Sequence, residues 1–131
     1  MIICPTKEHV IEFNRLAVAI NGDPHGVLNP GNLEYALDGL NNKYALHPEP
    51  LIAKAAFLLD YLANKGHVFI EGNKRTSLSA TASLLKLNGY SVNQDDEQTA
   101  GFVLEVAQGK RSLSEIQKWL KQNIKKIEGE E

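Results

Sequence analysis

The sequence has few of the features that mark secreted or membrane proteins. It contains one cysteine, Cys4, so an internal disulfide is excluded, and we expect the protein in the reducing cytoplasm. No apolar run approaches the ~20 residues that a membrane helix needs. The N-terminus also lacks the charged start and long apolar segment of a secretory signal. We therefore expect no membrane partner.

Neither sign of charge dominates the composition. The 16 acidic and 14 basic residues give a formal net charge of −2, so the chain has no overall basic field to attract nucleic acid. The histidines outside the motif described below, His9, His25 and His47, lack the spacing of zinc ligands. We expect neither direct nucleic-acid binding nor a zinc site.

Strand signals are scarce, and helical spacing dominates. Only the short segments 1–4 and 89–93 have a strand-like composition, enough for a minor edge or flap. The apolar residues fall instead on six helical stripes. These are Val10, Phe13, Ala17 and Ile20; Leu33, Ala36, Leu37 and Leu40; Leu51, Ala55, Leu58, Leu59 and Leu62; Ala82, Leu84, Leu85 and Leu87; Ala100, Val103, Leu104 and Ala107; and Leu113, Ile116 and Leu120. We expect an all-α fold, a compact bundle of about six helices in a single domain over residues 1–131.

Several local signals mark where these helices begin and end. Pro50 precedes the third stripe, Asn88-Gly89 closes the fourth, and residues 112–115 form a capping box that opens the sixth. The charged tail, residues 125–131, is predicted to fray. Two segments, 21–32 and 41–50, are rich in Gly, Pro and Asn. Loops of this length are often functional, although they also serve as plain connections.

One short stretch, "KGHVFIEGNKRTSL" at residues 65–78, concentrates polar groups between two predicted helices. A helix that begins near Asn73 presents unpaired N–H groups and a partial positive charge, which together attract anions. Lys74 and Arg75 lie in its first turn, where cations are unfavourable unless they face an anion. Gly66 is followed by five residues before Gly72, which does not fit a P-loop. The stretch predicts a phosphate site of another kind.

The order of groups in this stretch suits transfer of a phosphate-containing group. His67 has the chemistry to accept the proton of an attacking hydroxyl. Glu71 is a suitable ligand for Mg²⁺, which favours carboxylate and phosphate oxygens. Asn73, Lys74 and Arg75 would neutralise charge on the transferred group. We expect Phe69, with Val68 or Ile70, to pin the loop to the core.

The segment "HVFIEGNKR" resembles the signature of the Fic/Doc (Fido) family, His-x-Phe-x-Asp/Glu-Gly/Ala-Asn-Gly/Lys-Arg, at every defined position. The stretches "GVLNPGNLEYALDGL" and "SLSEIQKWLKQN" are also similar to the family, so the resemblance spans essentially the whole chain. It implies the Fido fold, with the motif between two central helices. It also implies that His67 is the general base, that Glu71 binds Mg²⁺ or positions the nucleotide, and that residues 72–75 cradle the phosphates. The segment 41–50 is expected to be the flap beside which an extended piece of the target protein lies.

Two positions resemble the Doc (death-on-curing) toxin branch more than Fic enzymes that transfer AMP. Lys74 stands where those enzymes have a second glycine, and Leu78 stands where they have a second arginine. The Doc branch implies that the γ-phosphate of ATP faces the hydroxyl, which makes the protein a kinase. Glu71 and Gly72 are closer to Fic. Two alternatives therefore stay open: AMP transfer to a protein, and a non-catalytic module that binds a nucleotide or a partner.

The resemblance also implies partners and control. A Doc-type toxin is expected to modify a translation elongation factor and arrest growth, and to be restrained by a Phd-like antitoxin. Some Fic proteins inhibit themselves through a helix carrying Ser/Thr-x-x-x-Glu-Gly/Asn. The nearest match here is Glu128-Gly129, placed by the pattern on a C-terminal helix, but residue 124 is Ile. We therefore expect no complete internal inhibitor.

Overall fold

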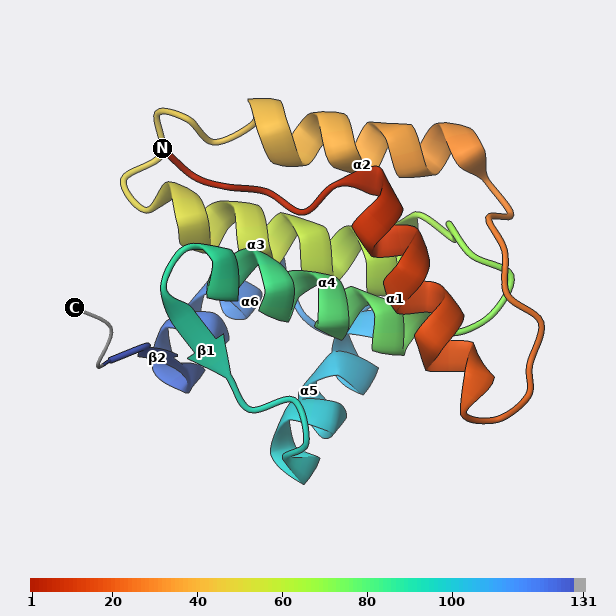
Figure 1. The fold of residues 1–131 in the computed structure, drawn as a ribbon. Helices are drawn as coiled ribbons and strands as arrows, with labels where there is room; N and C mark the ends of the chain where they lie inside the picture. Colours follow the sequence, from red (N-terminus) through yellow and green to blue (C-terminus); the bar gives the residue numbers. More distant parts are fainter. Residues whose placement is uncertain (129–131) are drawn as a thin grey trace.

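The computed structural model describes residues 1–128, and within them it forms an all-α fold with six α-helices and one small sheet of two antiparallel strands (Figure 1). The helices are α1 (Lys7–Ala19), α2 (Pro30–Asn42), α3 (Pro50–Asp60), α4 (Asn73–Leu87), α5 (Glu97–Ala107) and α6 (Leu113–Asn123). A π-helical turn, η1 (Tyr61–Lys65), continues α3. The strands are β1 (Tyr90–Val92) and β2 (Ile124–Lys126).

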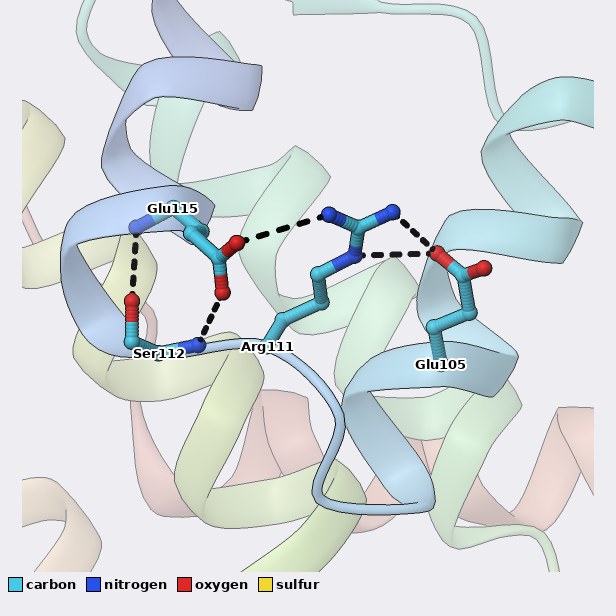
Figure 2. A network of polar contacts seen from close by, with 4 residues as sticks. All are labelled: Glu105, Arg111, Ser112 and Glu115. Carbon is cyan, nitrogen blue, oxygen red and sulfur yellow. Dashed lines mark hydrogen bonds and ion pairs between the residues drawn. The ribbon is translucent and has the colours of Figure 1, made fainter.

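The predicted helix signals operate as their chemistry requires. Pro30 and Pro50 occupy the first turns of α2 and α3, where a missing N–H costs nothing. The capping box of α6 forms in full: the Glu115 N–H donates to Ser112 Oγ at 3.1 Å, and the Ser112 N–H donates to Glu115 Oε1 at 2.9 Å (Figure 2). Gly89, with φ of 93°, follows the end of α4.

Helix α3 lies at the centre and is buried along almost its whole length. It packs against α4 and α6, and α1 packs across α4 (Figure 1). Buried side chains from all six helices join in one core cluster. The largest of those that are almost fully buried are Phe69, Leu33, Leu40, Leu58, Leu59, Leu62, Leu84, Leu85, Ile116 and Leu120. This core holds the motif loop between α3 and α4 in place.

The sequence prediction was wrong in the details of some faces. In α5 the buried residues are Thr99, Phe102, Val103 and Val106, whereas Ala100 and Leu104 point outward. The Phe102 ring stacks on Trp119 of α6 with centroids 4.4 Å apart. Packing the buried Phe102 ring against the partly buried Trp119 turns a different face of α5 inward from the predicted stripe. Ile20 lies beyond the end of α1 and is exposed.

The strand predictions were right in part. Segment 89–93 contains β1, but residues 1–4 form no strand, and β1 pairs instead with β2 from the charged tail. The prediction that the tail frays is therefore wrong as far as Lys126. The tail is ordered there because Ile124, just before it, packs against the core beside Tyr90 and Val92. Residues 129–131, the rest of that tail, lie outside the described residues. No helix of residues 1–128 is long and apolar enough to cross a membrane.

Candidate active site

The loop that joins η1 to α4 alternates between buried and exposed side chains. Val68 and Phe69 are fully buried, whereas His67 before them and Ile70 after them are exposed. Phe69 is thus the predicted anchor, and Val68 rather than Ile70 is its partner. Burial of these two side chains holds the loop against the core and leaves the His67 imidazole accessible to a reactant.

Asn73 closes this loop through a reciprocal amide pair. Its side-chain Oδ1 accepts from the Phe69 N–H at 3.0 Å, and its Nδ2 donates to the Phe69 carbonyl at 2.9 Å. The Asn73 side chain therefore fixes the loop, and its main-chain N–H belongs to the first turn of α4. Such first-turn N–H groups have no intrahelical acceptor and attract anions.

Gly72 starts α4 in a conformation that a larger residue would resist. Its φ is 78°, in the left-handed region, and a Cβ placed on it would lie 2.8 Å from Val18 Cγ1. Helix α1 is close here because Asn14, almost fully buried, donates through Nδ2 to the Glu71 carbonyl at 2.8 Å and to Thr76 Oγ1 at 3.2 Å. Asn14 therefore ties α1 to both the loop and α4.

The two cations of the motif have different surroundings. Arg75 donates through Nη1 to the Ala17 carbonyl at 3.2 Å, in the last turn of α1. Since the C-terminus of a helix carries partial negative charge, α1 offsets part of the cost of a cation at the start of α4. Arg75 therefore has a partner within the protein and does not require a bound anion. Lys74 is exposed at the same helix start.

These residues border a cleft of about 950 Å³. Its polar lining includes Glu71 to Arg75. Its apolar lining comes from the end of α1 and from η1, α4 and α5. The lining residues include Ala17, Val18, Asn21, Asp23, Ala63, Leu78, Gln94, Asp95, Ala100, Val103 and Ala107. A cleft with a cationic helix start and an apolar wall suits a ligand with an anionic end and a flat apolar end.

The cleft brings together five of the six predicted site residues, Glu71 to Arg75, but His67 is not among the residues that line it. His67 lies at the exposed beginning of the loop, four residues before Glu71. Sequence reasoning missed Asn14, whose signal is a polar residue inside the apolar stripe of α1.

The segment beside the motif loop is 26–29, not 41–50. Val27 forms an antiparallel bridge with Phe69, and the Ile70 N–H donates to the Gly26 carbonyl at 3.1 Å. Residues 43–49 precede α3, whereas the motif loop follows η1, so all of α3 separates them (Figure 1). The 11 residues of α3 span roughly 16 Å. The predicted position of the flap is corrected: the extended segment next to the motif comes from the loop between α1 and α2.

Glu71 offers one carboxylate to a metal ion. Residues 1–128 contain no cluster of three or more His, Cys, Asp or Glu side chains that would hold a metal ion by themselves. Mg²⁺ is commonly bound through one or two carboxylates together with substrate phosphates and water. The donor set therefore suits Mg²⁺ that arrives with a phosphate ligand.

Glu128 is far from the motif. It follows β2 and is not on a helix as predicted, and its neighbour Ile127 donates its N–H to the Gly89 carbonyl at 2.8 Å. Gly89 lies at the C-terminal end of α4, whereas Arg75 lies in the first turn. The 15 residues of α4 span roughly 22 Å. Glu128 therefore does not pair with Arg75 in this arrangement, and Gly129 lies outside the described residues.

Most of the chain matches a model of a known protein family. A search of curated proteins finds no significant match. The family model described as "Fic/DOC family" matches residues 6–85. The match covers more than half of the chain, from the N-cap of α1 into the last turns of α4, and it includes the whole motif. The chain therefore belongs to the Fic/DOC family.

Proposed function

We propose that this protein transfers the γ-phosphate of ATP to a hydroxyl group of a target protein, as a Doc-type toxin. Members of the Fic/DOC family are generally transferases that act on protein hydroxyls, typically with ATP and Mg²⁺. The observation that carries the proposal is the start of α4. There Gly72 to Arg75 line a cleft that also has apolar lining residues, and the exposed His67 lies in the loop that leads into this helix start.

Each motif residue has a role in this proposal. The first-turn N–H groups of α4 and the Lys74 ammonium bind phosphate oxygens. Glu71 would hold Mg²⁺, which would supply positive charge to neutralise the phosphates. His67 accepts the proton of the target hydroxyl as its oxygen bonds to the γ-phosphorus, the bond from that phosphorus to the bridging oxygen breaks, and ADP leaves.

Leu78 supports transfer of phosphate over transfer of AMP. It lines the cleft at the place where AMP-transferring relatives have a second arginine, so the cleft has apolar surface there in place of a cation. Lys74, in place of glycine, would fill space that the diphosphate needs in the orientation that transfers AMP. Glu71 and Gly72 keep the Fic-type residues, and AMP transfer is therefore the second candidate.

We also propose a translation elongation factor as the target and a separate Phd-like antitoxin as the restraint. The position of Glu128, at the far end of α4 from Arg75, supports a restraint supplied by another protein. Phosphorylation of an elongation factor would arrest growth by stopping translation.

The test is to incubate the purified protein with Mg²⁺, ATP and a bacterial elongation factor, and to measure the intact mass of the factor. Phosphate adds about 80 Da and AMP about 329 Da, since only AMP transfer retains the nucleoside. We expect the smaller addition, and we expect none with His67→Ala. The larger addition would support AMP transfer. Growth arrest by His67→Ala as strong as by the parent, with no modified protein in the cell, would favour the non-catalytic module.

A further inference from the structure

Three consecutive carbonyl groups of the motif loop accept hydrogen bonds from the start of α2. Asn32 Nδ2 donates to the Gly66 carbonyl at 2.6 Å, and Asn29 Nδ2 donates to the His67 carbonyl at 2.6 Å. The main-chain N–H groups of Leu28 and Asn29 both donate to the Val68 carbonyl, at 2.8 and 3.1 Å. We call Asn29 and Asn32 the asparagine clamp.

The residue at the centre of the clamp has an unfavourable backbone conformation. His67 has a φ of 44°, in the left-handed region where residues with a Cβ are uncommon. Such a conformation persists only when the surrounding structure over-determines it. Val68 and Phe69 are held by burial of their side chains, but the His67 side chain is exposed. Its Cα–Cβ direction is therefore set by its main chain, which the clamp holds.

The side chain of Asn29 does not cap the helix that it precedes. Asn29 is the N-cap residue of α2, and asparagine at this place normally accepts from an N–H of its own helix. Within the described part of the chain, Asn29 makes no such capping bond. Its amide faces the motif loop instead. A need to stabilise α2 therefore does not explain why the Asn29 amide bonds to the motif loop.

We propose that Asn29 and Asn32 are positioning residues that orient His67 for proton transfer. This inference rests on the proposed function, because it assigns a role toward the proposed general base. Loss of either amide donor frees the His67 main chain to relax to negative φ and turns the imidazole away from the target hydroxyl. Binding of ATP stays unchanged, because Glu71 to Arg75 are held by Asn14 and by the Asn73–Phe69 pair and not by the clamp.

The experiment measures kcat for protein modification and, separately, the Kd for ATP, in Asn29→Ala, Asn29→Asp and Asn32→Ala. Asn41→Ala is the matched control, because Asn41 Nδ2 also donates to a carbonyl, that of Leu37, at the other end of α2. We expect kcat to fall about a hundredfold when the imidazole is misplaced, with the Kd for ATP within about twofold of the parent. Asn29→Asp has the same shape without the donor, so we expect it to be at least as impaired as Asn29→Ala.

A second readout does not depend on activity. In the Asn29 variants, the Cα and Hα chemical shifts of His67 in NMR spectra should leave the values of a left-handed residue, whereas in Asn41→Ala they should not. Thermal unfolding shows whether each variant is folded. Parent-like kcat and parent-like His67 shifts in a folded Asn29→Asp variant overturn the inference. If the parent itself modifies no protein, the proposed function fails, and the shifts alone decide whether the clamp holds His67.

Discussion

Asn14 on α1 donates one side-chain amide to the main-chain oxygen of Glu71 at 2.8 Å and to Thr76 Oγ1 at 3.2 Å. The two acceptors lie on either side of the start of α4, so one buried residue fixes both the loop and the helix of the motif. The motif loop is therefore attached to α1, although Asn14 and Glu71 are 57 positions apart in the sequence.

Replacing Asn14 by Ala should destabilise the fold. Thr76 Oγ1 would lose its donor at a buried place, and the Glu71 carbonyl would lose its donor at a partly buried one, which costs about 1–3 kcal/mol. The measurement is the free energy of unfolding from urea denaturation. Asn123→Ala is the matched control, since Asn123 Nδ2 donates to the Trp119 carbonyl at 2.8 Å on the exposed face of α6. An equal loss in both variants would contradict a special role for Asn14.

Gly72→Ala should be strongly unfavourable. The new Cβ would meet Val18 Cγ1 at 2.8 Å, and φ of 78° adds backbone strain of about 1–3 kcal/mol. Gly101→Ala, in α5, is a control for which we expect the opposite sign. Nothing lies within 4 Å of a Cβ at this position, so the higher helix propensity of alanine should stabilise the fold by roughly 0.5–1 kcal/mol. Thermal unfolding of both variants tests this. Adding Val18→Ala should recover part of the loss from Gly72→Ala, and no recovery would mean that strain at φ accounts for all of it.

Asn73→Asp should open the motif loop. The carboxylate keeps an acceptor for the Phe69 N–H but places a second oxygen against the Phe69 carbonyl, where Asn73 donates. Loss of this bond is worth about 1–2 kcal/mol, or roughly tenfold in local opening. Hydrogen exchange of the loop amides measures it, and we expect faster exchange at Phe69 and Ile70. In Asn93→Ala, which alters a turn outside the motif, the exchange of these amides should stay at the parental rate.

Glu115 should make the stability depend on acid pH (Figure 2). A hydrogen bond from the Ser112 main-chain N–H, aided by the charge of Arg111, lowers the pKa of the Glu115 carboxyl below its ordinary value of 4.5. The carboxylate is thus favoured in the folded state. Its contribution is complete above pH 4.5 and is lost as the pH falls through the lowered pKa.

The measurement compares the parent with Glu115→Gln in urea denaturation at neutral pH and near pH 3. We expect the variant to be less stable at neutral pH and the difference to shrink in acid. Glu8→Gln, a change in the first turn of α1 outside this network, is the control. A difference between parent and Glu115→Gln that is equal at both pH values would show that the charge of Glu115 does not stabilise the fold.

The helices were predictable because their signals are local. Capping groups, prolines and apolar spacing lie within a few residues of the helix ends that they define, as in Ser112 and Glu115. The inward face of α5 was not predictable in the same way. Ala100 and Leu104 fit the stripe as well as Thr99 and Val106 do, and tertiary packing, including the stacking of Phe102 on Trp119, selects between them. The pairing of β1 with β2 likewise depends on residues far apart in the chain.

The position of the flap beside the motif loop also could not be predicted from local sequence. Both candidate loops have a composition rich in Gly, Pro and Asn, and the resemblance suggested 41–50. The choice depends on which end of α3 each loop meets, and the bridge between Val27 and Phe69 decides it. The asparagines of the clamp were visible in "NPGN", but their acceptors were not, because those lie 34 and 38 residues away.

The sequence by itself determined the helices and the chemical identity of the motif, because capping, periodicity and the order of His67, Glu71, Lys74 and Arg75 are properties of neighbours in the chain. Only the tertiary structure decided what holds that motif. Asn14, Asn29 and Asn32 reach it from other helices, and Arg75 meets the end of α1. The reason is physical. Buried and strained main-chain groups need hydrogen-bond partners, and the packing of distant segments determines which side chains lie close enough to provide them.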